Sequence, residues 1–201
     1  GYKVYGTARH VPDIALTGVT MLAMDVRSDA SVQSTVRHIL IESDRIDLLV
    51  NNAGIARVAA AEETSPEEAQ ELFQTNVFGL MRMTNAVLPA MRQRHAGRIV
   101  NISSVVGFMP APFMSAYAAS KHAVEGYTES LDHEIRALGI RAVTVQPAFT
   151  RSNLAASGAP SASARTGRRV LRSRASVSST ASWSSSARRA WRGGSSCVRG
   201  T

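Results

Sequence analysis

The stretch Ile46-Asp47-Leu48-Leu49-Val50-Asn51-Asn52-Ala53-Gly54 joins a short apolar run to a polar turn that ends in glycine. Nearly continuous apolar runs of this length are typical of parallel strands that are buried on both faces. Side chains that follow such a strand lie at its carboxyl end, where open α/β sheets bind their ligands. We therefore expect Ile46–Val50 to be a buried parallel strand and residues 51–54 to line a ligand crevice.

Other parts of the chain extend this pattern in both directions. Four more segments are β-prone, namely Tyr2–Thr7, Thr20–Met24, Arg98–Ile102 and Arg141–Val145. The segments between them show helical spacing of apolar residues, over about 30–42, 66–88 and 115–138. Ser65-Pro66-Glu67-Glu68 is a capping box, and Gly139 is a natural helix stop. Strands separated by helices predict a doubly wound α/β fold, with a parallel sheet covered on both faces.

The chain of 201 residues has a net charge of +8 that is unevenly distributed. Residues 1–150 contain 13 basic and all 15 acidic side chains, whereas residues 151–201 contain 10 arginines and no acid. The overall charge therefore does not indicate a nucleic-acid-binding surface in the first three-quarters of the chain. A single cysteine, Cys197, excludes an internal disulfide and a thiolate metal site. With no apolar run near the ~20 residues of a membrane helix and no signal-peptide pattern, we expect a cytoplasmic protein without a membrane partner.

Tyr117 and Lys121 are four residues apart at the start of a predicted helix, which places them on the same face. A tyrosine has a pKa of about 10, and a neighbouring ammonium lowers it by stabilising the phenolate. With an upstream serine to orient a carbonyl, the pair is suited to proton transfer between an alcohol and a carbonyl compound. The alternative is a solvated lysine beside a half-buried tyrosine. The chain has 21 arginines and only two lysines, which favours a specific need for an ammonium at position 121.

Four motifs occur together in one order and at characteristic spacings. They are Asn51-Asn52-Ala53-Gly54, Asn76-Val77-Phe78-Gly79, Asn101-Ile102-Ser103-Ser104 and Tyr117-x-x-x-Lys121. In this combination the chain resembles the short-chain dehydrogenase/reductase superfamily over about residues 1–154. The resemblance implies a Rossmann-type sheet, a nicotinamide dinucleotide cofactor, hydride transfer with a small alcohol or carbonyl substrate, and a homo-oligomer.

The resemblance also implies a role for each matching residue at the reaction centre. Tyr117 would be the general acid/base, and Lys121 would lower its pKa and hold the nicotinamide ribose. Ser104, rather than Ser103, would bind the substrate carbonyl, because it stands 13 residues before the tyrosine. Asn76 would anchor a proton-relay water. Its polar side chain on an apolar helix stripe also indicates a buried hydrogen-bonding role, with a satisfied core amide as the alternative.

Cofactor choice is indicated at the end of the first predicted strand. Arg9 stands where an acidic residue would bind a free ribose hydroxyl, so we expect NADP(H), with NAD(H) as the alternative. An ordinary strand-end charge is the other interpretation of Arg9. Asp25 matches the residue that hydrogen-bonds the adenine, with a helix or turn cap as its alternative. The resemblance assigns further cofactor contacts to Asn51, Ala53, Gly54, Tyr117, Lys121, Pro147 and Thr150.

The apolar segment 105–115 predicts a pocket for a bulky hydrophobic alcohol or ketone.

Two parts of the chain depart from the family pattern. Its first residues match the family's second strand, so we expect the first strand and its glycine-rich pyrophosphate loop to be lacking. That strand would lie between segments 3–7 and 46–50 and would pair with both. Residues 155–201 are rich in Ser, Arg, Ala and Gly without an apolar period. The predicted division is therefore a partial Rossmann-type domain at 1–154 and a low-complexity tail at 155–201.

Three interpretations of this tail stay open. It is a basic arm that binds nucleic acid, a solvated disordered segment, or the product of a lost reading frame. The third is favoured, because the composition changes where the resemblance stops.

Two functions follow for the whole chain. The first is an NADP(H)-dependent oxidoreductase of the short-chain type, with this chain an inactive fragment and nucleic acid not expected as a partner. The alternative is a catalytically silent protein with a basic nucleic-acid-binding tail.

Overall fold

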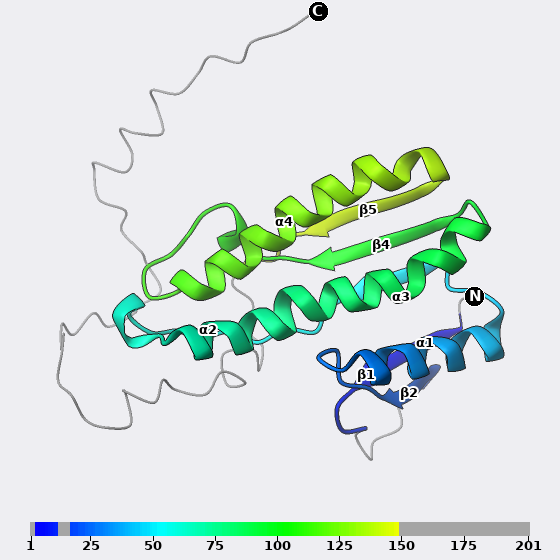
Figure 1. The fold of residues 1–201 in the computed structure, drawn as a ribbon, viewed down its shortest axis with the longest axis horizontal. Helices are drawn as coiled ribbons and strands as arrows, with labels where there is room; N and C mark the ends of the chain where they lie inside the picture. The colour runs from blue at the N-terminus through cyan, green and yellow to red at the C-terminus, as the bar shows by residue number, and fades with distance from the viewer. Residues whose placement is uncertain (1–2, 12–16, 149–201) are drawn as a thin grey trace, which may run out of the picture. The chain divides into compact units, whose positions relative to one another are not determined.

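The structure is a computed structural model that describes residues 3–11 and 17–148, within one unit of the chain, Gly1–Gly167 (Figure 1). Its strands are β1 (Val4–Ala8), β2 (Val19–Ala23), β3 (Leu48–Asn51), β4 (Gly97–Ile102) and β5 (Ile140–Val145). β1 pairs with β2, and β3, β4 and β5 form a sheet in that order, with every pair parallel. All five predicted strands are confirmed, each within two residues of its expected bounds. The predicted boundary at 154/155, the tail and Thr150 lie outside the described residues.

Helices connect the strands, as the apolar spacing predicts. They are α1 (Asp29–Ser43), α2 (Pro66–Phe73), α3 (Gly79–Gln93) and α4 (Ser115–Ile135), with 3-10 turns at Ala61–Glu63, Val105–Gly107 and Arg136–Leu138. The capping box is present, because Ser65 Oγ accepts from Glu68 N at 3.2 Å and Glu68 Oε2 accepts from Ser65 N at 3.1 Å. Gly139 ends the last turn with φ 76°, and a Cβ there would collide with the carbonyl of His95. Both sequence signals are therefore confirmed.

The long helix expected over 66–88 is interrupted. A π-helical turn, Gln74–Phe78, separates α2 from α3. The extra residue of such a turn displaces side chains from the regular helical spacing, and π-turns are frequent at functional sites. Here the turn contains Asn76, whose side chain is bonded away from its own helix, to the backbone of Ile55. A search for apolar periodicity does not detect this interruption, because Val77 and Leu80 are still buried.

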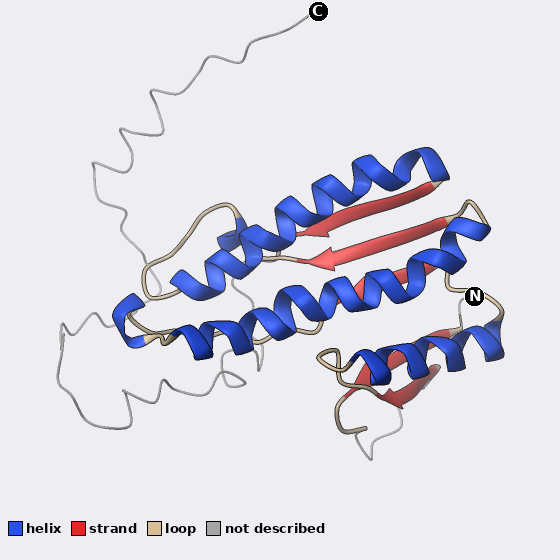
Figure 2. Cartoon of the chain, viewed as in Figure 1, coloured by secondary structure: helices blue, strands red, loops and turns tan. Residues whose placement is uncertain are grey.

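The core of the sheet lies on one face. Leu49, Ile99 and Ala142 are in register across β3, β4 and β5, and all three are buried. They belong to one apolar cluster with side chains from α1, α3 and α4, including Val32, Val36, Met83, Val87, Leu131 and Ile135. Figure 2 shows these helices on the same side of the strands. The shared cluster holds α4, which carries Tyr117 and Lys121, firmly against β5.

The opposite face of the sheet corrects two expectations. Leu48 and Val50 point to that face, and they are 47% and 50% exposed, so the strand is not buried on both faces. Nor do helices cover both faces in the described part of the chain. The physical reason is the strand order, because β3 to β4 and β4 to β5 are steps in the same direction. Right-handed crossovers in one direction place their helices on the same face.

β1 and β3 each have one edge without a partner within residues 3–11 and 17–148. β1 pairs only with β2, and β3 pairs only with β4. A cavity of about 510 Å³ is lined by residues of both strands, among them Val4, Tyr5, Leu48 and Val50. No described strand therefore lies between β1 and β3, at the position where the sequence predicts that a strand is lacking.

Candidate active site

Tyr117 lies in the first turn of α4, and only 5% of it is exposed. Ser104 follows the end of β4, and its hydroxyl is hydrogen-bonded with Tyr117. Burial raises the pKa of the tyrosine, and the bond to Ser104 opposes that rise. Ser104 Oγ also accepts from Val106 N at 3.4 Å, which fixes the serine in the turn. The structure thus places Ser104 beside Tyr117, whereas Ser103 Oγ is buried and has no hydrogen-bond partner among the described residues.

Lys121 lies one helical turn after Tyr117 and is also buried, with 6% of its surface exposed. Its Nζ donates to the carbonyl oxygen of Ile102 at 2.7 Å and lies 5.8 Å from the centre of the Tyr117 ring. Burial lowers the pKa of Lys121 to about 8, and the negative charge of Glu125 acts against this. The alternative of a solvated lysine is therefore excluded. An ammonium at this place lies close enough to stabilise a phenolate.

Asn76 connects the loop after β3 to α4. Its Oδ1 accepts from Ile55 N at 2.8 Å, and its Nδ2 donates to Ile55 O at 2.9 Å and to Ser120 Oγ at 3.1 Å. Ser120 in turn donates to the carbonyl of Tyr117 at 2.7 Å. The side-chain amide is thus fully bonded within the protein, as in the core-amide alternative. These bonds position the loop and the first turns of α4 relative to each other.

Gly54 adjoins this group of side chains. A Cβ at Gly54 would lie 3.4 Å from Asn76 Oδ1 and 4.0 Å from Lys121 Nζ. The loop backbone at Gly54 therefore lies beside the ammonium, and Ala53 next to it is exposed. Asn51 is also a predicted cofactor contact. Its side chain is buried and donates to Asn101 Oδ1 at 2.9 Å and to Thr84 Oγ1 at 3.3 Å, so that it links β3 to β4 and α3 in the core.

A second polar group lies at the carboxyl ends of β1 and β2. Asp25 accepts from the backbone N of Arg27 at 2.9 Å and from its guanidinium at 3.0 Å. These hydrogen bonds lower the pKa of Asp25, and the charge of the exposed Arg9 adds to the effect. Asp25 therefore serves as a turn cap, which was its alternative role, and two guanidinium groups flank it. Sequence reasoning missed Arg27, although a second cation two residues after Asp25 is visible in the chain.

The remaining predicted contacts lie around the end of β5. The carbonyl of Pro147 accepts from Val105 N at 3.0 Å, which joins the segment after β5 to the segment after β4. Phe108, Met109 and Phe113, which were expected to line an apolar pocket, are exposed large hydrophobic side chains. They give the surface near Ser104 an apolar character.

The residues present fit the two ends of a dinucleotide. The Lys121 ammonium, with one backbone acceptor, and the adjacent loop at Gly54 suit a ribose with its hydroxyl groups. Arg9 and Arg27 suit a phosphate at the other end. The pyrophosphate forms the middle of such a ligand. The N-termini of α1 and α2 are poorly suited to bind it, because their first turns carry Asp29, Glu67 and Glu68. Acidic first turns oppose the binding of a pyrophosphate.

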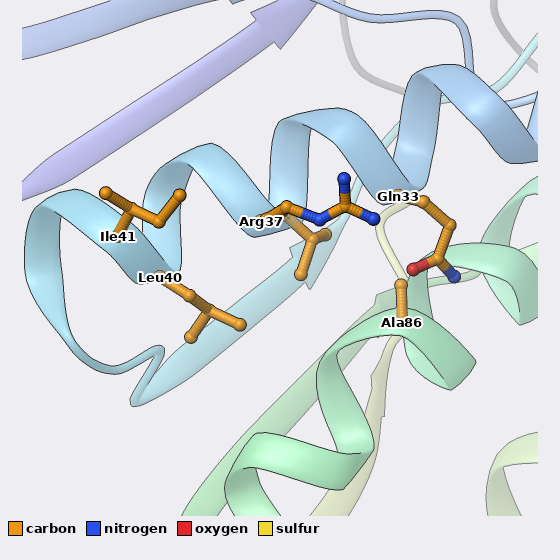
Figure 3. A pocket seen from close by; sticks show the side chains of 6 residues that line it. Gln33, Arg37, Leu40, Ile41 and Ala86 are labelled. Carbon is orange, nitrogen blue, oxygen red and sulfur yellow. The ribbon is translucent and has the colours of Figure 1, made fainter.

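A second tyrosine, serine and lysine meet in the described part of the chain, where Tyr5 Oη lies 2.8 Å from Ser43 Oγ and Lys3 Nζ lies 5.2 Å from the centre of the Tyr5 ring, but Lys3 is exposed and both Lys3 and Tyr5 donate to Glu42. An open cavity of about 360 Å³ lies between α1 and α3, lined by Gln33, Val36, Arg37, Leu40, Ile41 and Ala86 (Figure 3). It contains none of the predicted site residues. Among the described residues, no group of His, Cys, Asp and Glu is placed to hold a metal ion. None of the described helices has the length and apolarity that a membrane span requires.

The sequence and the structure of this chain are both similar to those of known proteins. A family model described as short chain dehydrogenase matches residues 6–162. The chain is 44% identical over 147 residues to a 3-ketodihydrosphingosine reductase of Bacteroides thetaiotaomicron, which covers 73% of this chain and 54% of that reductase. Its structure is similar to ElxO with NADP bound, with a TM-score of 0.71 and 29% identity, over 75% of this chain and 64% of that one. A 3-ketoacyl-(acyl-carrier-protein) reductase from Brucella melitensis, complexed with NADH, gives a TM-score of 0.67 and 29% identity, over 70% of this chain and 60% of that one. The chain thus spans 54% to 64% of the length of these proteins.

Proposed function

The chain belongs to the short-chain dehydrogenase family, whose model matches residues 6–162, and from this premise we propose that it carries the acid–base half of an NADP(H)-dependent oxidoreductase site. The reaction is hydride transfer between the cofactor and an alcohol or ketone. One observation carries the proposal, namely the buried pair Tyr117 and Lys121 with the half-buried Ser104 bonded to the tyrosine, where β4 meets the start of α4. Buried titratable groups with a specific charge partner are characteristic of catalytic sites.

Each of these side chains has a task that follows from its place. Ser104 donates a hydrogen bond to the substrate carbonyl and holds its oxygen near the Tyr117 hydroxyl. Tyr117 gives its proton to that oxygen in reduction and takes it back in alcohol oxidation. Lys121 stabilises the phenolate that remains, since its ammonium lies against the same ring. Asn76 holds the Gly54 loop and the start of α4 in place through its bonds to Ile55 and Ser120, and the proton-relay water stays a predicted contact of this residue. The nicotinamide cofactor supplies or accepts the hydride.

Cofactor binding is assigned to residues at both ends of the crevice. Lys121 and the loop at Ala53 and Gly54 hold the nicotinamide ribose. Arg9, with Arg27 beside it, binds a 2′-phosphate and so favours NADP(H) over NAD(H). The Asp25 carboxylate does not provide a free acceptor for a 2′-hydroxyl, because Arg27 occupies both of its oxygens. Thr150 and Pro147 stay predicted contacts of this cofactor.

The substrate is proposed to be a bulky, hydrophobic ketone or the corresponding alcohol. Phe108, Met109 and Phe113 are exposed after Ser104 and supply an apolar surface beside the reaction centre. Both of the named reductases above are, by their names, reductases of keto compounds. The homo-oligomeric state that the family resemblance implies belongs to the same proposal.

Binding of NADPH tests the proposal on the chain itself. We expect the 201-residue chain to bind NADPH poorly and to turn over little, because no described segment cradles a pyrophosphate and β1 and β3 lack a common partner. The comparison is an extended protein, in which a designed β-strand and glycine-rich loop precede residue 1. Calorimetric titration at about 150 mM salt, where exposed charges are screened beyond about 8 Å, should show clearly tighter binding by the extended protein.

The tail requires its own control in this titration. Removal of residues 155–201 should leave specific binding unchanged and remove a weak, salt-sensitive background from the 9 arginines of that segment. Low-micromolar binding by the 201-residue chain, retained without the tail, would show that the two sheets need no further strand. Loss of binding only when the tail is removed would favour the alternative of a phosphate-binding tail.

Cofactor preference gives a second prediction. In the extended protein, Arg9→Ala should lower the ratio of kcat/KM for NADPH to that for NADH at least about tenfold, because a charge-assisted bond contributes roughly 1.5–3 kcal/mol. The ratio is measured by initial rates with each cofactor at saturating substrate. Arg37→Ala, which removes an exposed arginine of α1, is the matched control and should leave the ratio unchanged. Equal use of NADPH and NADH before any substitution would refute the assignment.

A further inference from the structure

Glu125 is an ionisable side chain close to the reaction centre that the proposed mechanism does not use. It lies on α4 one turn after Lys121, and therefore on the same helix face. Its Oε1 atom is buried and has no hydrogen-bond partner among the described residues. A carboxylate oxygen withdrawn from water without a partner is costly, so its position requires a compensating interaction.

The surroundings of this oxygen are polar but contain no ion pair at bonding distance. A Cβ at Gly107 would lie 3.2 Å from Glu125 Oε1 and 2.7 Å from Ser103 Oγ, so both atoms border the same point of the backbone. Ser103 is 3% exposed, and its hydroxyl is also without a partner in the part of the chain that the structure describes. Gly107 leaves room for the carboxylate, which a side chain at that position would displace.

Lys121 is the cation that compensates this carboxylate. The charge of Glu125 acts on Lys121 and raises its pKa, against the stronger effect of burial. Without a negative charge nearby, burial favours the neutral amine. The ammonium has three donors, and the structure gives it one protein acceptor, the carbonyl of Ile102. Glu125 therefore favours the protonated form at the pH where the enzyme works.

Other charged groups around α4 are engaged elsewhere. The turns Val105–Gly107 and Gln74–Phe78, which pack against α4, contain no titratable side chain. On α2, Glu67 and Glu68 are bonded to the Ser65 cap, and the charge of Glu71 acts on Arg27. Arg136 and Arg141, from the segments that follow α4, pair with Asp132. The other titratable side chains of α4 are Tyr117, His122, Tyr127, Glu129, Asp132, His133 and Glu134, and Glu125 is the charged group whose effect on the pKa of Lys121 opposes that of burial.

We propose that Glu125 is a positioning residue that keeps Lys121 an ammonium at neutral pH, so that Lys121 stabilises the Tyr117 phenolate. The proposal rests on the proposed function for its role in catalysis, but the Glu125–Lys121 interaction is a property of the chain itself. Glu125→Gln retains the shape of the side chain and removes its charge. It should lower the pKa of Lys121 by about 1, the size of a Coulomb interaction between partly buried charges.

The chain has only two lysines, which makes this interaction directly measurable. Lysine labelled with ¹³C at Cε gives two NMR signals in the 201-residue chain, and each is followed as pH rises from about 6 to about 11. Lys121 should titrate near pH 8, whereas Lys3, which bonds Glu42 and Tyr5 at the surface, has its pKa raised. Glu125→Gln should shift only the Lys121 signal, and Glu125→Asp should restore most of the original value. Glu129→Gln, four residues further along the same helix, is the matched control and should shift neither.

Each outcome of this titration decides the proposal. An unchanged Lys121 pKa in Glu125→Gln overturns the proposal. It is also overturned if Lys3 and Lys121 titrate together above pH 10 in the unsubstituted chain, because Lys121 would then not be buried. An unfolded Glu125→Gln variant would raise the Lys121 pKa rather than lower it, so misfolding cannot imitate the expected result. In the extended protein, Glu125→Gln should also move the alkaline limb of kcat to lower pH. If Glu125→Gln shifts the Lys121 signal but neither the 201-residue chain nor the extended protein turns over substrate, the proposed function is contradicted. The Glu125–Lys121 interaction would still stand.

Discussion

Tyr117→Phe is expected to lower kcat of the extended protein at least about 100-fold, within the range that general acid–base groups contribute. Phenylalanine keeps the buried ring but has no proton to exchange with the substrate oxygen. The ring packs among Ala56, Leu72, Val106 and Ala118, and these contacts stay the same. Folding and NADPH affinity should therefore change little, so the loss appears in kcat. Steady-state rates with a hydrophobic ketone, together with thermal melting of both proteins, measure the two effects separately.

A second tyrosine of the same helix supplies the control. Tyr127 is half-buried on α4, and its hydroxyl is hydrogen-bonded with Thr84 rather than Ser104. Tyr127→Phe should keep nearly all of the activity, since it removes a hydroxyl from the core and none from the site. If Tyr117→Phe retains more than a tenth of the original kcat, Tyr117 is not the acid–base group.

Lys121→Met is expected to have the second largest effect on catalysis. The substitution removes the ammonium that both stabilises the Tyr117 phenolate and holds the nicotinamide ribose. Methionine fills most of the buried volume, so the fold is preserved. We expect kcat/KM to fall at least about 100-fold, with kcat lowered as well as NADPH affinity. Lys121→Arg should not restore activity, because the space beside Gly54 and Asn76 suits a compact ammonium rather than a planar guanidinium.

The matched control is the other lysine of the chain. Lys3→Met removes the exposed ion pair between Lys3, which precedes β1, and Glu42 of α1, and such pairs contribute little. Its kinetics should match those of the unsubstituted protein. A Lys121→Met variant that keeps its kcat, with only KM raised, would restrict Lys121 to binding and remove it from the chemistry.

Local sequence signals predicted the elements of the fold well. Apolar runs marked the five strands, the Ser65 capping box marked the start of α2, and Gly139 marked the end of the 3-10 turn that follows α4. These signals are local because each depends on a few neighbouring residues and on backbone geometry. Tyr117 and Ser104 could likewise be brought together from the sequence, because consecutive parallel strands and helices place their adjoining ends on one edge of the sheet.

Properties that depend on distant parts of the chain were predicted less well. The run Leu48–Val50 has the composition of a doubly buried strand, but its burial depends on which face the other helices cover. Asn51 stands in a motif, yet its amide is used by Asn101 and Thr84, residues that only the register of the sheet brings near. The π-turn contains Asn76, whose side chain bonds to Ile55 in the loop after β3, a contact that apolar helical spacing does not encode. The sequence search also passed over Arg27 and Glu125, whose roles depend on the charges that they meet in space. The tail, its boundary, Thr150 and the cytoplasmic location stay predictions.

Transfer of deuterium tests the central claim, that Tyr117, Ser104 and Lys121 form the acid–base half of an oxidoreductase site. The extended protein is incubated with NADPH that carries deuterium at C4 of the nicotinamide and with a hydrophobic ketone, and the product is examined by mass spectrometry. The account predicts an alcohol with deuterium on its carbinol carbon, formed at least about 100-fold more slowly by Tyr117→Phe. Tight NADPH binding without deuterium transfer to any hydrophobic ketone, or equal transfer by Tyr117→Phe, would contradict it.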